Sequence, residues 1–273
     1  PGVVSVADAD AATTKSAPAD VDGPGPLVVV PASGASANGG SFAIAANGSF
    51  TYVPPAGFTG TDTFTYQVTD QDPTTPQTVT GTVSVTVGQR VWYVRDVVDA
   101  NNAAGGDGRS SNAFDSIAAF NAATTNDGDV IFVFRGNTGT TALSGGFTLR
   151  NGQKLWGEGI GLTIAGFGTL VPAGLRPRIS NGSGVAAYVD TASLPAGHRE
   201  NVEIRGLELS GSAAGVGLLS SGASLVSVRV SENVVEATGG NGISAGLGSS
   251  LGQQVAIHDN TVTATGTGIL VQK

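Results

Sequence analysis

Three stretches of alternating apolar and polar residues recur in the C-terminal third of the sequence, at 202–207, 228–233 and 255–260. They start 26 and 27 residues apart, and a Gly-aliphatic pair follows each of them at a similar spacing. Those pairs stand at 215–216, 242–243 and 268–269. A period in the twenties, with short period-two strands and Gly or Asn at the corners, is typical of β-solenoids. The repeats therefore predict a solenoid with one coil per repeat.

The first third of the sequence shows period-two strands without that repeat. Residues 41–45 and 49–53 alternate in polarity on either side of Asn47-Gly48, a strong signal for a two-residue hairpin turn. Similar alternation at 64–69 and 79–87 indicates half-buried antiparallel strands at the spacing of a β-sandwich. An antiparallel Ig-like sandwich is therefore expected here.

One segment between the two patterns has helical periodicity. In residues 112–123, Phe114 and Ile117 fall near one face, and Ser111 or Asn112 can cap the N-terminus. We expect this helix to act as a lid that covers the exposed backbone edge of the first coil.

These patterns place the chain in the all-β class and divide it into two domains. An N-terminal antiparallel Ig-like β-sandwich is predicted over residues 1–89, and a C-terminal parallel β-helix with a short capping helix over 90–273. The capping helix is expected at about 112–123 and the coils from about 128 onward. The sequence begins at Pro1 and contains no Met, which indicates a piece of a longer polypeptide.

Composition and charge narrow the function classes. Charged residues make up 12% of the 273, the net charge is −8 and the pI is about 4.6. Nucleic acids and anionic lipid surfaces are not expected partners, because both need Lys/Arg patches. No apolar run approaches the roughly 18 residues of a membrane-spanning helix, so no membrane insertion is expected. The sequence has no cysteine, which excludes disulfides and thiolate chemistry.

Residues 48–70, GSFTYVPPAGFTGTDTFTYQVTD, carry a specific motif. The motif resembles the bacterial Ig-like, cadherin-like tandem repeats that make up the stalks of large secreted surface adhesins. The resemblance extends over about residues 1–89 and implies an extracellular location on a bacterial cell surface. The N-terminal half departs from the family pattern. Family members usually open with an Asn-Asp turn, whereas this chain has SVADAD at 5–10 and a longer Ala-rich insertion.

Oxygen ligands for a hard cation stand in the same domain. Asp20, Asp22, Asp62 and Asp70 are the candidate calcium ligands, with Asp72 as a further one, because oxygen-only sites suit Ca²⁺. Aspartates that cap turns explain the same residues without a metal. Calcium is the one cofactor that the sequence suggests.

A second resemblance covers residues 91–273. A Gly-rich loop at 105–108, the amphipathic segment 112–123, the strand 128–134 and the sequence LWGEG at 155–159 follow one another. In combination they resemble the N-terminal cap of right-handed parallel β-helix proteins. That superfold includes pectate-lyase-like enzymes, phage tailspikes and many surface proteins.

Enzymes of that superfold place carboxylates with basic residues on one outward face, so the acids of the coils are the catalytic candidates. Aligning the coils puts Glu232 beside Asp259, each one residue before a corner asparagine. Such a pair suits acid/base catalysis or a cation, although a solvated turn is the simpler interpretation. No Asp-Asp, Gly-His-Gly or Arg-x-Lys constellation occurs in the repeats. Their other charged residues and histidine are Glu203, Glu208, Glu236, Arg205, Arg229 and His258.

Two further polar features favour structural explanations. The histidines, His198 and His258, share no spacing with other metal-ligand residues. Asn233 and Asn260 occupy one corner of successive coils, where stacked side-chain amides would form a ladder that ends at Leu207.

The sequence therefore predicts a non-catalytic structural or adhesive segment of a secreted bacterial cell-surface or extracellular-fibre protein. Its expected partners are filament neighbours, which would associate with the open edge of the last coil, or a surface glycan. The alternative is a polysaccharide lyase or glycoside hydrolase with an accessory Ig-like domain.

Overall fold

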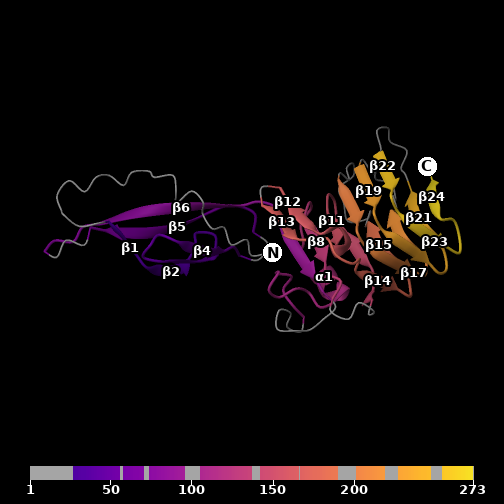
Figure 1. The fold of residues 1–273 in the computed structure, drawn as a ribbon, viewed down its shortest axis with the longest axis horizontal. Coiled ribbons are helices and arrows are strands. Elements are labelled where there is room, and N and C mark those ends of the chain that lie inside the picture. Colours follow the sequence, from indigo (N-terminus) through magenta and orange to yellow (C-terminus); the bar gives the residue numbers. More distant parts are fainter. Residues whose placement is uncertain are drawn as a thin grey trace. The chain divides into compact units, whose positions relative to one another are not determined.

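The computed structural model describes most of the chain in two compact units, one ending at Gly88 and the other beginning at Gln89 (Figure 1). The described residues are 27–55, 58–70, 74–95, 105–136, 142–165, 167–189, 201–218, 227–246 and 254–272. They are nearly all β, which confirms the predicted fold class. No helix among them is long and apolar enough to cross a membrane.

The described strands of the N-terminal unit form two antiparallel sheets, in the orders β1-β5-β6 and β2-β3-β4. The chain reverses between β3 and β4 at Asn47-Gly48, as predicted, but through a three-residue loop instead of a two-residue turn. The N–H of Ala45 donates to the carbonyl of Ser49 at 2.8 Å, the N–H of Gly48 donates to the carbonyl of Ala45 at 2.9 Å, and Gly48 adopts left-handed backbone (φ 82°) at the end of the loop. The strands are β1 (Val28–Val30), β2 (Ala32–Ala35), β3 (Ser41–Ile44), β4 (Phe50–Val53), β5 (Gly60–Thr69) and β6 (Thr78–Val87).

Aromatic rings make up most of the core of the N-terminal unit. Phe64 of β5 is buried and stacks on Phe42 of β3, with ring centroids 4.2 Å apart. Tyr52 and Val85 complete the buried cluster. Within the described strands this cluster is small, so polar contacts carry more of their organisation than they do in the C-terminal unit.

The described coils of the C-terminal unit form three parallel sheets that run along a solenoid of about four turns (Figure 1). The first sheet contains β7 (Val91–Val94), β8 (Val130–Val133), β11 (Lys154–Gly157), β16 (Val202–Arg205), β19 (Ser227–Ser231) and β22 (Gln254–His258). The second contains β9 (Leu143–Ser144), β14 (Arg178–Asn181), β17 (Glu208–Gly211), β20 (Val234–Ala237) and β23 (Thr261–Ala264). The third contains β10 (Phe147–Leu149), β15 (Val185–Val189), β18 (Ala214–Leu218), β21 (Asn241–Gly246) and β24 (Ile269–Gln272).

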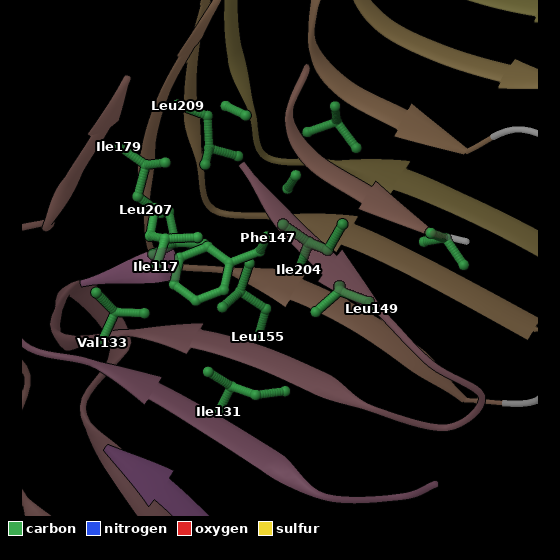
Figure 2. Packing of buried hydrophobic residues seen from close by; sticks show 14 of the residues in the cluster. Ile117, Ile131, Val133, Phe147, Leu149, Leu155, Ile179, Ile204, Leu207 and Leu209 are labelled. Carbon is green, nitrogen blue, oxygen red and sulfur yellow. The ribbon is translucent and has the colours of Figure 1, made fainter. Parts of the chain in front are cut away.

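The strand register confirms that each sequence repeat forms one coil. Val202 pairs with Val228, which pairs with Val255 in the next coil. Inside the coils, equivalent aliphatic residues stack in rows, so that Leu155 lies beside Ile204 and both are fully buried (Figure 2). Each row removes apolar surface from water along the whole solenoid, which is what stabilises the stack.

The helix α1 (Ile117–Ala122) is shorter than the predicted 112–123, and its N-cap is Ser116 rather than Ser111 or Asn112. The preceding residues are extended because Phe114 bridges to Val94 of β7 and so belongs to the first coil. The side chain of Asn121 then pairs with the free edge of β10. Its Nδ2 donates to the carbonyl of Gly146 at 2.9 Å, and its Oδ1 accepts from the N–H of Thr148 at 3.3 Å. The helix therefore covers a coil edge, as predicted.

An antiparallel hairpin, β12 (Leu162–Ile164) and β13 (Gly168–Val171), interrupts the coils and was not predicted. Leu162 and Ile164 pack against Val130 and Phe132 on the outward side of β8. The hairpin explains why β8 is buried at all four positions, although one face of a solenoid strand normally meets water.

Candidate functional site

Asp62, one of the four predicted calcium ligands, is fully buried near the start of β5. Its carboxylate accepts hydrogen bonds from the hydroxyls of Ser36 (2.5 Å) and Tyr52 (2.7 Å). It also accepts from the backbone N–H groups of Asn38 (2.9 Å) and Thr63 (2.7 Å). Burial on its own would raise the pKa of Asp62, but these donors outweigh it and lower the pKa to about 2. Burial and the contact with Asp62 raise the pKa of Tyr52 to about 12.

Among the other predicted calcium ligands, Asp70 is described by the structure and does not join Asp62. Asp70 follows the far end of β5, eight residues along an extended strand and thus about 26 Å away, where it accepts from the N–H of Gln77 at 2.9 Å. Asp20, Asp22 and Asp72 lie outside the described residues. Within the described part of the chain, no three His, Cys, Asp or Glu side chains gather in a way that could hold a metal. Calcium binding stays a prediction.

The outward face of the first solenoid sheet carries several of the charged residues of the coils. The register places Lys154, Glu203 and Arg229 in one row across β11, β16 and β19. Trp156 and Arg205 stand beside each other in the next row. Residues of opposite charge therefore alternate along the first of these rows, and Glu203 Oε2 lies 3.8 Å from Arg205 Nη1 on its own strand.

Glu232 and Asp259 occupy the same corner of successive coils, as the alignment predicted, and both adopt left-handed backbone (φ 60° and 55°). Each of the two carboxylates has a different partner. Arg205 Nη2 lies 2.7 Å from Glu232 Oε2, and Arg176 Nε donates to the backbone carbonyl of Glu232 at 2.9 Å. Asp259 Oδ2 instead lies 2.7 Å from the ring Nδ1 of His258.

The predicted asparagine ladder is confirmed. The side-chain Nδ2 of Asn233 donates to Asn260 Oδ1 at 3.0 Å and to the carbonyl of Ile204 at 2.8 Å. Its Oδ1 accepts from the N–H of Leu207 at 3.1 Å, where the ladder ends. Asn233 is buried, so these bonds satisfy backbone groups that would otherwise be unpaired at the corner. His198 lies outside the described residues.

A polar cleft opens where the strands of the first sheet begin. Its volume is about 520 Å³, which is within the range of about 300–1,000 Å³ that is usual for ligand sites. The lining residues come from the turns before β7, β8, β11 and β16, from the first residue of β11 and from the second residue of β16. They are Gln89, Asp127, Gly128, Asn151, Gly152, Lys154, Asn201 and Glu203.

Most of these cleft residues could not be selected from the sequence. Asn151-Gly152 and Asp127-Gly128 have the composition of ordinary turns, and Gln89 stands at the domain boundary. The one indication in the sequence is the position of these residues just before strands. Residues that precede equivalent strands of successive coils must lie side by side. That signal needs the register of the first coils, which do not share the repeat seen at 202–260.

Residues 2–88 match the family model of the bacterial cadherin-like domain. This finding confirms the resemblance carried by residues 48–70. Comparisons with curated proteins and with solved structures found no match. The chain thus combines a bacterial cadherin-like domain with a β-solenoid, a combination that fits a surface or adhesin-like module. Domains of this family are typically found in extracellular or surface proteins.

Proposed function

We propose that this chain is a non-catalytic structural and adhesive segment of a secreted bacterial cell-surface protein. The match of residues 2–88 to the cadherin-like domain, directly followed by a solenoid, carries the proposal. In this role the N-terminal unit is a spacer, and the solenoid is a stiff element that presents side chains from several coils on one face. Nearest-neighbour stacking of coils suits such an element, because it builds length without a larger core.

The ion pairs of the solenoid support a structural use of its acids. Glu232 is paired with Arg205 at 2.7 Å, and Glu208 with Arg178 at 2.8 Å. Both pairs join residues of neighbouring coils, so these carboxylates link the stack. A hydrolase of the two-carboxylate type instead needs one acid free to protonate the leaving group and a second free to act as base or nucleophile.

Two measurements test the proposal. Antiserum against the purified chain should label intact cells of the source bacterium, and failure to label the surface would contradict an adhesive role. The purified chain should release neither unsaturated uronates from polyuronates nor reducing ends from neutral polysaccharides. Turnover in either assay would favour the lyase or hydrolase alternative.

Self-association is part of the proposal and rests on the last strand of the third sheet. Among the described strands β24 stands last in that sheet, and its Ile269 and Val271, which continue the inward rows of Ile243 and Ala245, are 46% and 50% exposed. An edge strand with exposed aliphatic side chains favours pairing with another β-strand. Light scattering after size exclusion should show oligomers that weaken in the variant Val271→Lys. A monomer at every concentration would contradict this part.

A further inference from the structure

We propose that the polar cleft at the start of the first sheet binds a saccharide, with a preference for neutral or amino sugars over uronic acids. The inference rests on the proposed adhesive function, for which it names the ligand class. It concerns Gln89, Asp127, Asn151, Lys154, Asn201 and Glu203, whose side chains line the cleft.

The walls of the cleft are held by backbone hydrogen bonds between successive coils. The N–H of Gly128 donates to the carbonyl of Asn151 at 2.9 Å, and that of Glu203 donates to Gln153 at 3.2 Å. The N–H of Lys154 donates to the carbonyl of Asp129 at 3.0 Å. The polar side chains therefore project from a fixed frame, which lowers the entropy lost on binding.

Hydrogen-bond donors and acceptors both face the cleft, which is what sugar hydroxyls require. A hydroxyl donates one hydrogen bond and accepts others, so a polyol is bound well only where carboxylates and N–H groups stand together. Asp127 and Glu203 supply the carboxylates. Lys154 supplies an ammonium group, and Gln89, Asn151 and Asn201 supply side-chain amides.

Two of these charged groups are positioned by Trp156 of β11. The indole Nε1 donates to Glu203 Oε2 at 3.1 Å, which orients the carboxylate. The ammonium of Lys154 lies 5.4 Å from the centre of the indole ring and has no carboxylate within ion-pair distance among the described residues. A cation held over an aromatic face in this way keeps its N–H donors available to a ligand.

Other ligand classes fit the cleft less well. A divalent cation needs more oxygen ligands than Asp127 and Glu203 provide, and the described residues contain no group of three metal-ligating side chains. A phosphate group needs several cations, but Lys154 is the only one in the lining. An apolar ligand would leave the polar lining unpaired.

The charges in the lining also select among sugars. The lining contains two carboxylates and one ammonium, and Arg205 Nη1 lies 3.8 Å from Glu203 Oε2, so Asp127 is the carboxylate that disfavours a uronate and favours a neutral or protonated amino sugar. The proposal is therefore distinct from the lyase alternative, whose substrates would be polyuronates.

Binding of the full chain to a glycan array, followed by calorimetry, tests the proposal. The soluble probes are mannotriose as a neutral sugar, a glucosamine trimer as an amino sugar and trigalacturonate as an acidic one. We expect binding to neutral or amino glycans, with trigalacturonate at least about tenfold weaker. Lys154→Ala and Asp127→Asn should each weaken the binding by about tenfold or more, because each removes a charged hydrogen-bond partner.

The matched control is Glu236→Gln, which changes an exposed acid on β20, in another sheet, and should leave the affinity unchanged. Circular dichroism checks that each variant is folded. The proposal is overturned if no neutral or amino glycan on the array binds, if acidic glycans bind best, or if the binding survives both cleft variants. Surface labelling of cells does not depend on the cleft, so a labelled surface without glycan binding would overturn this inference alone.

Discussion

The two units of this chain are stabilised in different ways. Among the described residues of the N-terminal unit, the buried apolar cluster consists of Tyr52, Phe64 and Val85 with a few partly buried neighbours, and the buried carboxylate of Asp62 joins two of the unit's elements. In the solenoid, aliphatic residues such as Leu155 and Ile204 repeat from coil to coil in one continuous cluster. In the unit with the smaller apolar cluster, one buried polar group holds the strands together. In the solenoid, the stabilisation is distributed over many equivalent contacts between stacked coils.

The two arrangements respond differently to a lost side chain. Backbone pairing in the solenoid joins each strand only to the strands before and after it in its sheet, so the stability of the stack is approximately a sum of neighbour terms. A change in one coil therefore weakens two interfaces and leaves the others intact. The hydrogen bonds of Asp62 instead connect Ser36 and Asn38 to Tyr52 on another strand, so its loss affects the whole N-terminal unit.

The largest expected effect is that of Asp62→Ala in the N-terminal unit. The change leaves the buried hydroxyls of Ser36 and Tyr52 and two backbone N–H groups without their acceptor, at a cost of about 3–5 kcal/mol. Hydrogen exchange, read by mass spectrometry over residues 60–69, should show greatly reduced protection. Both tryptophans, Trp92 and Trp156, lie in the solenoid, so their fluorescence should show an unchanged solenoid transition.

Asp70→Ala is the control for Asp62→Ala, because Asp70 accepts a hydrogen bond in an exposed turn. It should cost less than about 1 kcal/mol. Equal losses in the two variants would contradict the view that one buried carboxylate organises this unit. Repeating both measurements with and without added Ca²⁺ tests the calcium prediction, which requires a calcium-dependent gain in protection that Asp70→Ala abolishes.

The next largest effect is expected for Ile204→Ala in the solenoid. Ile204 is fully buried between Leu155 and Val230 of the neighbouring coils, and truncation should cost about 3 kcal/mol through lost burial and the cavity left behind. Tryptophan fluorescence during urea unfolding measures the change. Arg229→Ala, on the outward face of the next strand, should move the midpoint little.

A smaller effect is expected for the asparagine ladder. Asn233→Ala removes hydrogen bonds to Ile204 and Leu207 at a buried corner and should cost about 2 kcal/mol. Asn260→Ala removes equivalent bonds at a more exposed corner and should cost about half as much, or about 1 kcal/mol. If urea unfolding gave equal losses of unfolding free energy for the two variants, burial would not determine how much each asparagine of the ladder stabilises the fold.

Most of the fold could be predicted from periodicity, because residues 202–260 repeat both a strand pattern and a corner pattern at one spacing. The helix was predicted too long at its N-terminus. Phe114 has helical spacing to Ile117, but pairing with Val94 in the first coil overrides that local preference. The hairpin β12–β13 was missed because its strands are short, and its pairing depends on the outward apolar face of β8.

The candidate site was less predictable than the fold. The corner residues Glu232 and Asn233 could be aligned from the repeat, and the structure places them as expected. The cleft residues Asp127 and Lys154 belong to coils that do not share the repeat, so only the strand register brings them to the side of Asn201. Asp62 was predicted from the sequence as a calcium ligand because its carboxylate supplies oxygen atoms. The sequence held no indication that hydroxyls from residues 36 and 52 would satisfy it.

Tyr52→Phe has a modest expected effect at neutral pH, and it separates the acid and alkaline limits of the N-terminal unit. Because the folded-state pKa of Asp62 is lowered from 3.8 to about 2, its contribution is fully present above pH 4 and is lost as the pH falls towards about 2. The pKa of Tyr52 is raised from 10.0 to about 12, so its contribution to stability is present below pH 10 and is lost as the pH rises towards about 12.

Tyr52→Phe should cost about 1 kcal/mol at neutral pH and should abolish this alkaline loss of stability. It should also make the acid loss smaller, since Asp62 keeps its other donors but loses one. Protection of residues 60–69 from hydrogen exchange, corrected for the intrinsic exchange rate at each pH, measures both limits, and an alkaline limit that persists in the variant would assign it to another group.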